Sequence, residues 1–395
     1  MAKDLKPHIG IFGKRNSGKS SLINALTGQQ AAIVSEQAGT TTDPVKKSVE
    51  IFGIGPAIII DTAGIDDIGE LGAKRIKKSK EIIPQINIAI LVFTNNDFDD
   101  EDKKLIRQFE RYKIPFILAH NKCDIMKLSI CMEKEISRHY CRAVLEISTD
   151  TNEGIDELTK EIIARIPKSA YTKPSLFAGL IKAGDTVLLV TPIDSEAPEG
   201  RMILPQVMAI RDVLDKDSIC VLVKETQLED YINSNTNIDL VITDSQAFAM
   251  VSDIVPEDIP LSSFSIIFSR IKAHWEPILE GTKHISKLKD GDNVLILESC
   301  THHVSCEDIG RFKLPKWLSE FTGKKLNYEI VSGLQEFEEK LDDCALVIQC
   351  GGCVATQKQI QNRLQLAIDK DIAVSNYGMA IAYTTGVFER ATQMF

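Results

Sequence analysis

The stretch Gly13-Lys14-Arg15-Asn16-Ser17-Gly18-Lys19-Ser20 decides the fold of the first part of this chain. It follows the apolar run Ile9 to Phe12 and opens a helical pattern, which is the context that a phosphate-binding loop requires. Backbone amides of such a loop face phosphates, Lys19 would neutralise the β and γ oxygens, and the Ser20 hydroxyl would bind Mg²⁺. We therefore expect a nucleotide to be held by Gly13, Asn16, Ser17, Gly18, Lys19, Ser20 and Ser21.

Two later motifs identify the nucleotide. Asp61-Thr62-Ala63-Gly64 follows the apolar run Ala57 to Ile60, where Asp61 can hold the water shell of Mg²⁺ and the Gly64 amide can meet the γ-phosphate. Asn121-Lys122-Cys123-Asp124 ends another apolar run, and Asp124 can accept two hydrogen bonds from guanine. A carboxylate placed for those donors rejects adenine, which lacks them. The sequence therefore predicts GTP, with Asn121, Lys122 and Asp124 at the base.

Two further loops complete the predicted site. Ser148-Thr149 stands where the loop that packs on the base is expected, with Thr149 in place of the usual alanine. Gly39-Thr40-Thr41-Thr42-Asp43 lies where a switch loop should be, although a solvated loop would have a similar composition. We choose Thr41 as the Mg²⁺ ligand that senses the γ-phosphate, with Thr40 as second choice. Lys19, Thr41 and Gly64 are the expected catalytic residues.

The composition limits the other possibilities. A chain of 395 residues is too long for one ordinary core, so two or three domains are expected. A formal net charge of -10 argues against nucleic acid as the main partner. The apolar runs are too short to span a bilayer and no signal peptide is recognised, so we expect a cytoplasmic protein. In that compartment 9 cysteines favour reduced thiols or metal ligands over disulfides.

Strand-like apolar runs alternate with helical patterns along the whole chain, which predicts a three-domain α/β protein. The first domain, 1–170, is expected to be a GTPase with a mostly parallel sheet, and two smaller α/β domains should follow at 171–262 and 263–395. Its predicted strands are Ile9–Phe12, Ala57–Ile60, Ile88–Phe93, Phe116–Ala119 and Val144–Ile147. The later ones are Thr186–Val190, Ser218–Val223, Leu240–Thr243, Asn293–Leu297, Leu326–Ile330, Ala345–Ile348 and Ile372–Ser375.

Three cysteines in the last domain form a pattern of metal ligands. Cys300-Thr301-His302 and Cys350-Gly351-Gly352-Cys353 each follow a predicted strand, and the carboxyl ends of parallel strands share one crevice. Three thiols can hold an iron-sulfur cluster and leave one iron open. Buried structural cysteines are one alternative, and a zinc site of three cysteines with His302 is another. The fourth ligand could be His302, Glu307, Cys306, water or an exogenous molecule.

The nucleotide motifs resemble those of the translation-factor-related small GTPases. Ile65 follows Gly64, where a Ras-like enzyme has the glutamine that orients the attacking water. Asn16 matches the asparagine that binds a monovalent cation in the potassium-activated members of this group. The resemblance therefore implies GTP hydrolysis stimulated by K⁺, with Asn16 as a K⁺ ligand.

Taken together, the GTPase motifs, the middle α/β region and the cysteine pattern resemble the HydF family of FeFe-hydrogenase maturation GTPases. The resemblance covers essentially the whole chain, including Gly200-Arg-Met-Ile-Leu-Pro-Gln-Val and Glu298-Ser-Cys-Thr-His-His. One departure is Gln349, which stands where the family pattern has histidine. That departure removes one proposed cluster ligand.

The resemblance implies a homodimeric scaffold that joins through residues 171–262 and binds a 4Fe-4S cluster through Cys300, Cys350 and Cys353. It also implies that a di-iron precursor arrives from radical-SAM maturation enzymes and passes to apo-FeFe-hydrogenase, with no nucleic acid or membrane as partner. A ribosome- or tRNA-associated GTPase with a zinc-stabilised C-terminal domain is the alternative, although the acidic charge counts against it. A GTP-regulated iron-sulfur redox enzyme is a third possibility, but no substrate-pocket motif supports it.

Overall fold

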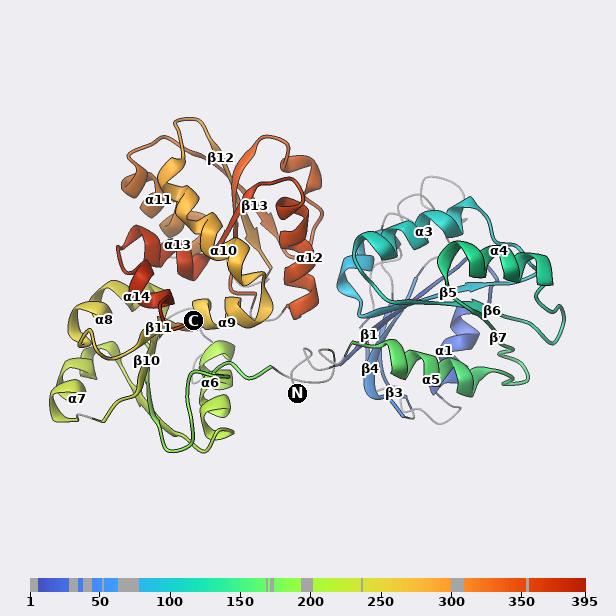
Figure 1. Ribbon diagram of the computed structural model, residues 1–395, viewed down its shortest axis with the longest axis horizontal. Coiled ribbons are helices and arrows are strands. Elements are labelled where there is room, and N and C mark those ends of the chain that lie inside the picture. The colour runs from blue at the N-terminus through green and yellow to red at the C-terminus, as the bar shows by residue number, and fades with distance from the viewer. Residues whose placement is uncertain are drawn as a thin grey trace. The chain divides into compact units, whose positions relative to one another are not determined.

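The computed structural model of the protein forms two compact units, Met1–Lys173 and Pro174–Phe395, which are described separately (Figure 1). It describes residues 6–27, 35–37, 45–51, 53–62, 78–167, 170, 174–192, 202–235, 237–299, 309–352 and 355–395. Within this part of the chain no helix is long and apolar enough to cross a membrane.

The first unit contains a seven-stranded sheet in the order β2-β3-β4-β1-β5-β6-β7. All neighbouring strands are parallel except that β3 runs antiparallel to both β2 and β4. The strands are β1 (His8–Phe12), β2 (Ser35–Gln37), β3 (Val45–Ile51), β4 (Gly55–Asp61), β5 (Ile88–Phe93), β6 (Phe116–His120) and β7 (Val144–Glu146). This sheet confirms the predicted P-loop α/β fold.

Helices cover both faces of this sheet, so its central strands are buried on both sides (Figure 1). The apolar faces of α1 (Lys19–Thr27) and α5 (Ile155–Arg165) belong to one core, whereas those of α3 (Asp100–Arg111) and α4 (Ile130–Tyr140) belong to the other. A short 3-10 turn, Ile83–Gln85, precedes β5. The carboxyl ends of β1, β4, β6 and β7 lead into the predicted nucleotide motifs.

The second unit contains two four-stranded parallel sheets. The first has the order β11-β10-β8-β9 and consists of β8 (Thr186–Val190), β9 (Ile219–Val223), β10 (Leu240–Thr243) and β11 (Leu261–Ser263). Its helices are α6 (Leu204–Leu214), α7 (Leu228–Ser234), α8 (Phe248–Ile254) and α9 (Phe264–Lys272). The expected domain boundary after residue 262 falls inside β11.

The other sheet has the order β13-β12-β14-β15. Its strands are β12 (Asn293–Glu298), β13 (Asn327–Ser332), β14 (Cys344–Gln349) and β15 (Ala373–Asn376). The helices that accompany it are α10 (Trp275–Thr282), α11 (Leu314–Thr322), α12 (Gln357–Ile368), α13 (Tyr377–Thr384) and α14 (Phe388–Thr392). Because β12 lies between β13 and β14 and all three run parallel, their carboxyl ends lie side by side at one edge of the sheet.

One hydrophobic core joins the two sheets of the second unit. Leu188 and Val241 of the first sheet belong to the same buried cluster as Leu295 and Val347 of the second. Polar contacts cross the same boundary, since Ser262 Oγ donates to the Ala391 carbonyl at 2.9 Å and Asn376 Nδ2 donates to the Ser265 carbonyl at 3.0 Å. The two smaller sheets are therefore packed as one body.

Candidate functional site

The phosphate-binding loop follows β1 and opens α1. Lys19 Nζ donates to the carbonyls of Gly13 at 2.9 Å and Lys14 at 2.7 Å, so its ammonium lies over the loop. Gly13 has a φ of +148°, and a Cβ there would lie 2.1 Å from the carbonyl oxygen of Val92 on β5. A larger residue could not occupy this position without displacing β5. Ser17 Oγ is buried and has no hydrogen-bond partner in the described part of the chain.

Ser20 and Asp61 meet beside this loop. Ser20 Oγ donates to Asp61 Oδ2 at 3.0 Å, which joins the first residues of α1 to the end of β4. Burial raises the pKa of Asp61, while the hydrogen bond from Ser20 and the positive charges of Lys19 and Lys47 oppose that rise. A hydroxyl beside a partly buried carboxylate is a donor set that fits Mg²⁺. The two residues that the sequence assigned to the metal are thus brought together.

Asn121 joins three loops of the predicted site. Its Nδ2 donates to the Ser17 carbonyl at 2.9 Å, and its Oδ1 accepts from the Thr149 amide at 3.2 Å. Gly18 packs against it so closely that a Cβ would lie 2.2 Å from Asn121 Nδ2. Asn121 therefore holds the phosphate loop and the base loop together.

The structure describes some of the other residues that were predicted to bind the nucleotide and leaves others outside its described part. Ser148 is buried, Lys122 has a φ of +62°, and Asp124 is exposed at the surface of the same loop. Asn16 and Ser21 are also exposed. A cavity of about 170 Å³ adjoins these elements, and its lining includes Lys14, Arg15, Asn16, Ser17, Thr94, Asn95 and Lys122. Outside the described residues lie Thr40, Thr41, Gly64 and Ile65.

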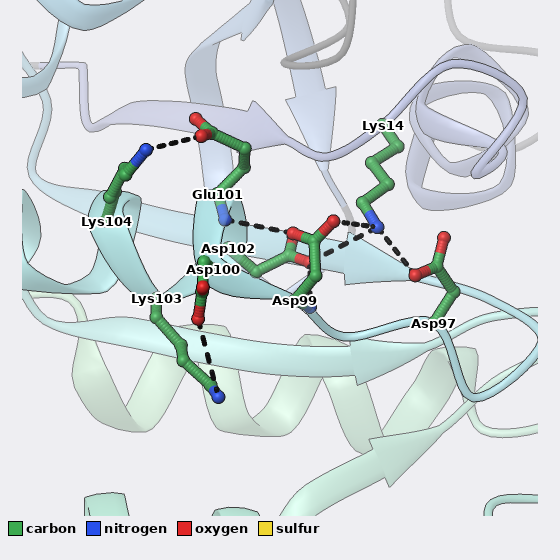
Figure 2. Close-up of polar contacts among 8 residues, drawn as sticks. All are labelled: Lys14, Asp97, Asp99, Asp100, Glu101, Asp102, Lys103 and Lys104. Atoms are coloured by element: carbon green, nitrogen blue, oxygen red, sulfur yellow. Dashed lines mark hydrogen bonds and ion pairs between the residues drawn. The ribbon is translucent and has the colours of Figure 1, made fainter.

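An acidic cluster around Lys14 was not foreseen from the sequence. Figure 2 shows the Lys14 ammonium between carboxylates of the segment that leads from β5 into α3. Its Nζ lies 2.7 Å from Asp97, 2.8 Å from Asp99 and 3.9 Å from Asp102. Burial lowers the pKa of Lys14, but the hydrogen bonds to Asp97 and Asp99 outweigh burial and leave it raised. The motif places Lys14 near phosphates, whereas only the fold supplies its carboxylate partners.

Asp102 is the buried member of this cluster, with no exposed side-chain surface. Its Oδ2 accepts the Asp99 amide at 3.1 Å, while Asp99 Oδ1 accepts the Glu101 amide at 2.9 Å, so both carboxylates cap α3. Burial raises the pKa of Asp102 to about 6, against the lowering effects of the hydrogen bond from Asp99 and the charge of Lys14.

Cys350 lies at the carboxyl edge of the β13-β12-β14-β15 sheet. Its side chain is buried, and Sγ accepts hydrogen bonds from the Ser299 amide at 3.1 Å and from Gln349 Nε2 at 3.4 Å. In the register of the sheet, Leu297 of β12 pairs with Gln349 of β14. The backbone that leads to Cys300 therefore begins beside Cys350, as the sequence predicted from the two strand ends.

Gln349 has a role that the sequence did not indicate. Its Nε2 also donates to Ser299 Oγ at 2.9 Å and to the carbonyls of Cys350 at 3.1 Å and Leu297 at 3.3 Å. The amide thus donates to the cysteine sulfur and fastens the two strand ends to each other. Its Oε1 is buried without a partner in the described part of the chain.

One cationic side chain contacts the Cys350 loop, and the pKa of a second responds to the charge of Cys350. Lys272 of α9 is buried and its Nζ donates to the carbonyls of Gly352 and Ala355, each at 2.9 Å. Arg363 of α12 is buried as well, and burial lowers its pKa to about 10 while the charge of Cys350 opposes the change. Neither residue belongs to a motif, and no local signal in the sequence could have identified them.

The other predicted metal ligands, Cys300, His302, Cys306, Glu307 and Cys353, lie outside the described residues. Among the residues that are described, no three His, Cys, Asp or Glu side chains gather as a metal site. Cys344, at the opposite end of β14 from Cys350, donates to the Leu346 carbonyl at 3.2 Å and is partly buried.

Sequence models of known families match three separate stretches of the chain. The hydrogen maturase F dimerization domain matches residues 176–273, and the hydrogen maturase F tetramerization domain matches residues 276–394. The model of a 50S ribosome-binding GTPase matches residues 8–122.

Individual relatives resemble parts of the chain. The tRNA modification GTPase MnmE of Francisella tularensis subsp. novicida is 31% identical over 218 residues, covering 52% of this chain and 46% of that protein. MnmE of Francisella philomiragia is 39% identical over 165 residues, covering 40% of this chain and 34% of that protein. The chain thus spans less than half the length of these curated relatives.

Solved GTPase structures also match. The G domain of the T. maritima FeoB iron transporter has a TM-score of 0.33 and 24% identity, covering 41% of this chain and 99% of that one. An Era variant of Aquifex aeolicus bound to GDP and AlF4⁻ has a TM-score of 0.36 and 20% identity, covering 57% of this chain and 93% of that one.

Proposed function

Because the chain belongs to the hydrogen maturase F (HydF) family, a family of hydrogenase maturation GTPases that self-associate, we propose that it is an iron-sulfur scaffold. In this proposal a homodimer carries a 4Fe-4S cluster and delivers a di-iron precursor of the active site to apo-FeFe-hydrogenase. Radical-SAM maturation enzymes supply that precursor. GTP hydrolysis times the association with these partners or the release from them.

In this proposal each residue of the nucleotide site has its own role. Lys19 neutralises the phosphate charge, Ser20 and Thr41 bind Mg²⁺, Asp61 holds its water shell, and the Gly64 amide meets the γ-phosphate. Asp124 recognises guanine, while Lys122, Ser148 and Thr149 surround the base. The 3.0 Å contact between Ser20 and Asp61 supports this assignment, as does the Ser17 hydroxyl, which has no hydrogen-bond partner among the described residues.

Potassium stimulation is a further part of the proposal. Asn16 is exposed in a left-handed conformation, with a φ of 57°, and lines the cavity beside Ser17. Its side-chain carbonyl can therefore contribute to a K⁺ site near the phosphates. We expect faster GTP hydrolysis in KCl than in NaCl, and an Asn16→Ala variant should lose most of that difference. Equal turnover of the unchanged protein in both salts would contradict the assignment.

The scaffold role depends on Cys300, Cys350 and Cys353 as ligands of the cluster. The observation that supports it best is the environment of Cys350, whose sulfur accepts two N–H donors beside the strand end that leads to Cys300. Such donors stabilise a thiolate and orient it toward a metal. When bound, the cluster would supply an iron with an exchangeable fourth position. His302, Glu307, Cys306, water or an exogenous group could occupy that position.

Anaerobic reconstitution of the full chain with iron and sulfide tests this proposal. We expect iron uptake and, after reduction, an EPR signal of a 4Fe-4S cluster. Cys350→Ser should lose most of both, whereas Cys344→Ser is the matched control because Cys344 lies at the other end of the same strand. Uptake of zinc without iron, or equal iron content in Cys350→Ser, would overturn the scaffold role.

A further inference from the structure

Arg363 carries a buried guanidinium that is only partly satisfied. The residue is 6% exposed, and its Nη1 donates to the Gly333 carbonyl at 2.7 Å. Its charge also lies over the Phe337 ring, 5.1 Å from the centroid. In the described part of the chain, Nε and Nη2 have no hydrogen-bond partner. One edge of the guanidinium is therefore fixed, while the other edge presents two free donors.

The topology brings this side chain to the Cys350 edge of the sheet. Arg363 belongs to α12, which follows β14, whereas Gly333 directly follows β13. Because β12 lies between these two strands, the contact from α12 to Gly333 spans the strand that ends just before Cys300. Cys350 is also the charged group that acts on the pKa of Arg363. The free donors thus belong to the same edge as the proposed cluster ligands.

Leaving such donors unpaired is energetically costly. A buried polar group without a partner destabilises the folded state, and an unpaired charged group does so more strongly. The N–H bonds of Nε and Nη2 point in parallel from one edge of a guanidinium. Together they can donate to two acceptor atoms of one anion. Because burial leaves the pKa of Arg363 near 10, the group is still charged at neutral pH. The arrangement fits an anion better than a neutral ligand.

We propose that Arg363 is an anion-binding residue that pairs through Nε and Nη2 with an anion held beside Cys350. This inference rests on the scaffold role proposed above. The anionic acceptors have two possible sources, which are the sulfur atoms of the cluster itself and a small carboxylate bound at the open iron. Arg363 is distinct from the metal ligands, since it contributes positive charge and paired donors to the group that they hold.

The experiment compares reconstituted full-length protein with Arg363→Gln, Arg363→Lys and Arg390→Gln. Arg390 is the control because it is a guanidinium of the same unit that donates to the carbonyls of Ser252, Val255 and Pro256. Iron content, the EPR-monitored reduction potential and the affinity for acetate are measured for each. The potential is informative because cluster potentials depend on net charge and on hydrogen bonds to sulfur.

The two sources predict different results. If cluster sulfur is the partner, Arg363→Gln lowers the reduction potential without added ligand, and Arg363→Lys restores part of it. If a carboxylate is the partner, Arg363→Lys keeps the positive charge and leaves the potential without acetate unchanged, while both Arg363 variants bind acetate at least about tenfold more weakly. Arg390→Gln should match the unchanged protein in both measurements.

Two outcomes would count against the inference, and they distinguish an error about Arg363 from an error about the scaffold role. If the unchanged protein takes up iron but both Arg363 variants match it in potential and in acetate affinity, the role of Arg363 is wrong and the scaffold role stands. If the unchanged protein takes up no iron, the scaffold role fails and this inference fails with it. An Arg363→Gln variant that does not fold is replaced by Arg363→Lys, whose acetate affinity tests the paired donors.

Discussion

At the scale of single residues, Asn121 shows how one amide can organise a nucleotide site. It uses its donor on the Ser17 carbonyl and its acceptor on the Thr149 amide. Neutral hydrogen bonds of this kind contribute about 1 kcal/mol each. Both bonds join separate loops of the site. Without them, the bound nucleotide alone would have to hold these loops at the required distance from each other.

We therefore predict that Asn121→Ala weakens binding of a fluorescent GDP analogue by at least about tenfold, because two interloop hydrogen bonds are lost. Asn327→Ala is the control, since this asparagine of the second unit also makes two hydrogen bonds, to Gly291 and Asn293, away from the nucleotide motifs. Equal affinity of the Asn121 variant and the unchanged protein would refute the prediction.

The buried carboxylate of Asp102 predicts a pH dependence of stability. Burial raises its pKa from 3.8 to about 6, with Lys14, Asp97 and Asp99 as the charged groups that face it. Between these values the folded state holds more protons than the unfolded state, so the contribution of Asp102 to stability falls as pH rises. Two pKa units correspond to about 3 kcal/mol.

Asp102→Asn should remove this dependence, because the amide does not titrate and its oxygen can still accept the Asp99 amide. Relative to the unchanged protein, the variant should become more stable as pH rises from 4.5 to 7.5. Urea unfolding of both proteins at several pH values measures the difference. A constant difference in unfolding free energy across that range would contradict the raised pKa.

At the scale of elements, the strands with strong apolar runs were predictable and the others were not. Every predicted strand lies at a strand of the structure, and the central ones are continuously apolar because they are buried on both faces. β3 at Val45–Ile51 was missed because it contains Lys46, Lys47, Ser48 and Glu50. β11 was missed because Ser262 and Ser263 are buried polar residues whose partners lie elsewhere in the structure.

The helix that follows the Cys350 loop has a complete capping box. Thr356 Oγ1 accepts the Gln359 amide at 3.3 Å, and Gln359 Oε1 accepts the Thr356 amide at 2.8 Å. The two bonds satisfy amides that the first turn of α12 would otherwise leave unpaired. Arg363 also belongs to α12. The residue at which this helix begins therefore determines where the Arg363 guanidinium lies.

Thr356→Ala should lower the unfolding free energy of the second unit by about 1 kcal/mol, which is typical of a lost N-cap. Thr384→Ala is the matched control, because Thr384 bonds only to carbonyls of its own helix, at Ala380 and Ile381, and caps nothing. Guanidinium unfolding followed by circular dichroism compares the two. A larger loss for Thr384→Ala would show that the cap is not the stabilising feature.

At the scale of the whole molecule, the number of folding units is smaller than the number of sheets. The first unit has its own two cores, one on each face of its sheet. In the second unit, one buried cluster contains residues from both four-stranded sheets, and Trp275 packs edge-on against Phe395 at 4.9 Å. Separating these sheets would expose apolar surface that stabilises both.

We predict that a fragment of residues 1–173 and a fragment of residues 174–395 each unfold cooperatively. Fragments 174–273 and 274–395 should not, because each retains only part of the shared core. Thermal denaturation and amide hydrogen exchange of the four fragments measure this. Native-like protection in fragment 274–395 alone would show that the second sheet does not need the first.

The sequence by itself determined the nucleotide motifs, the class of the fold and the placement of Cys350 at a strand end beside β12. These features depend on glycines, polar groups and apolar runs that act within a few residues of one another. Only the tertiary structure decided that Lys14 pairs with Asp97 and Asp99, that Lys272 holds the Cys350 loop, and that Arg363 faces the same edge. Long charged side chains have no periodic pattern, and their partners depend on strand order and packing, which no local spacing encodes.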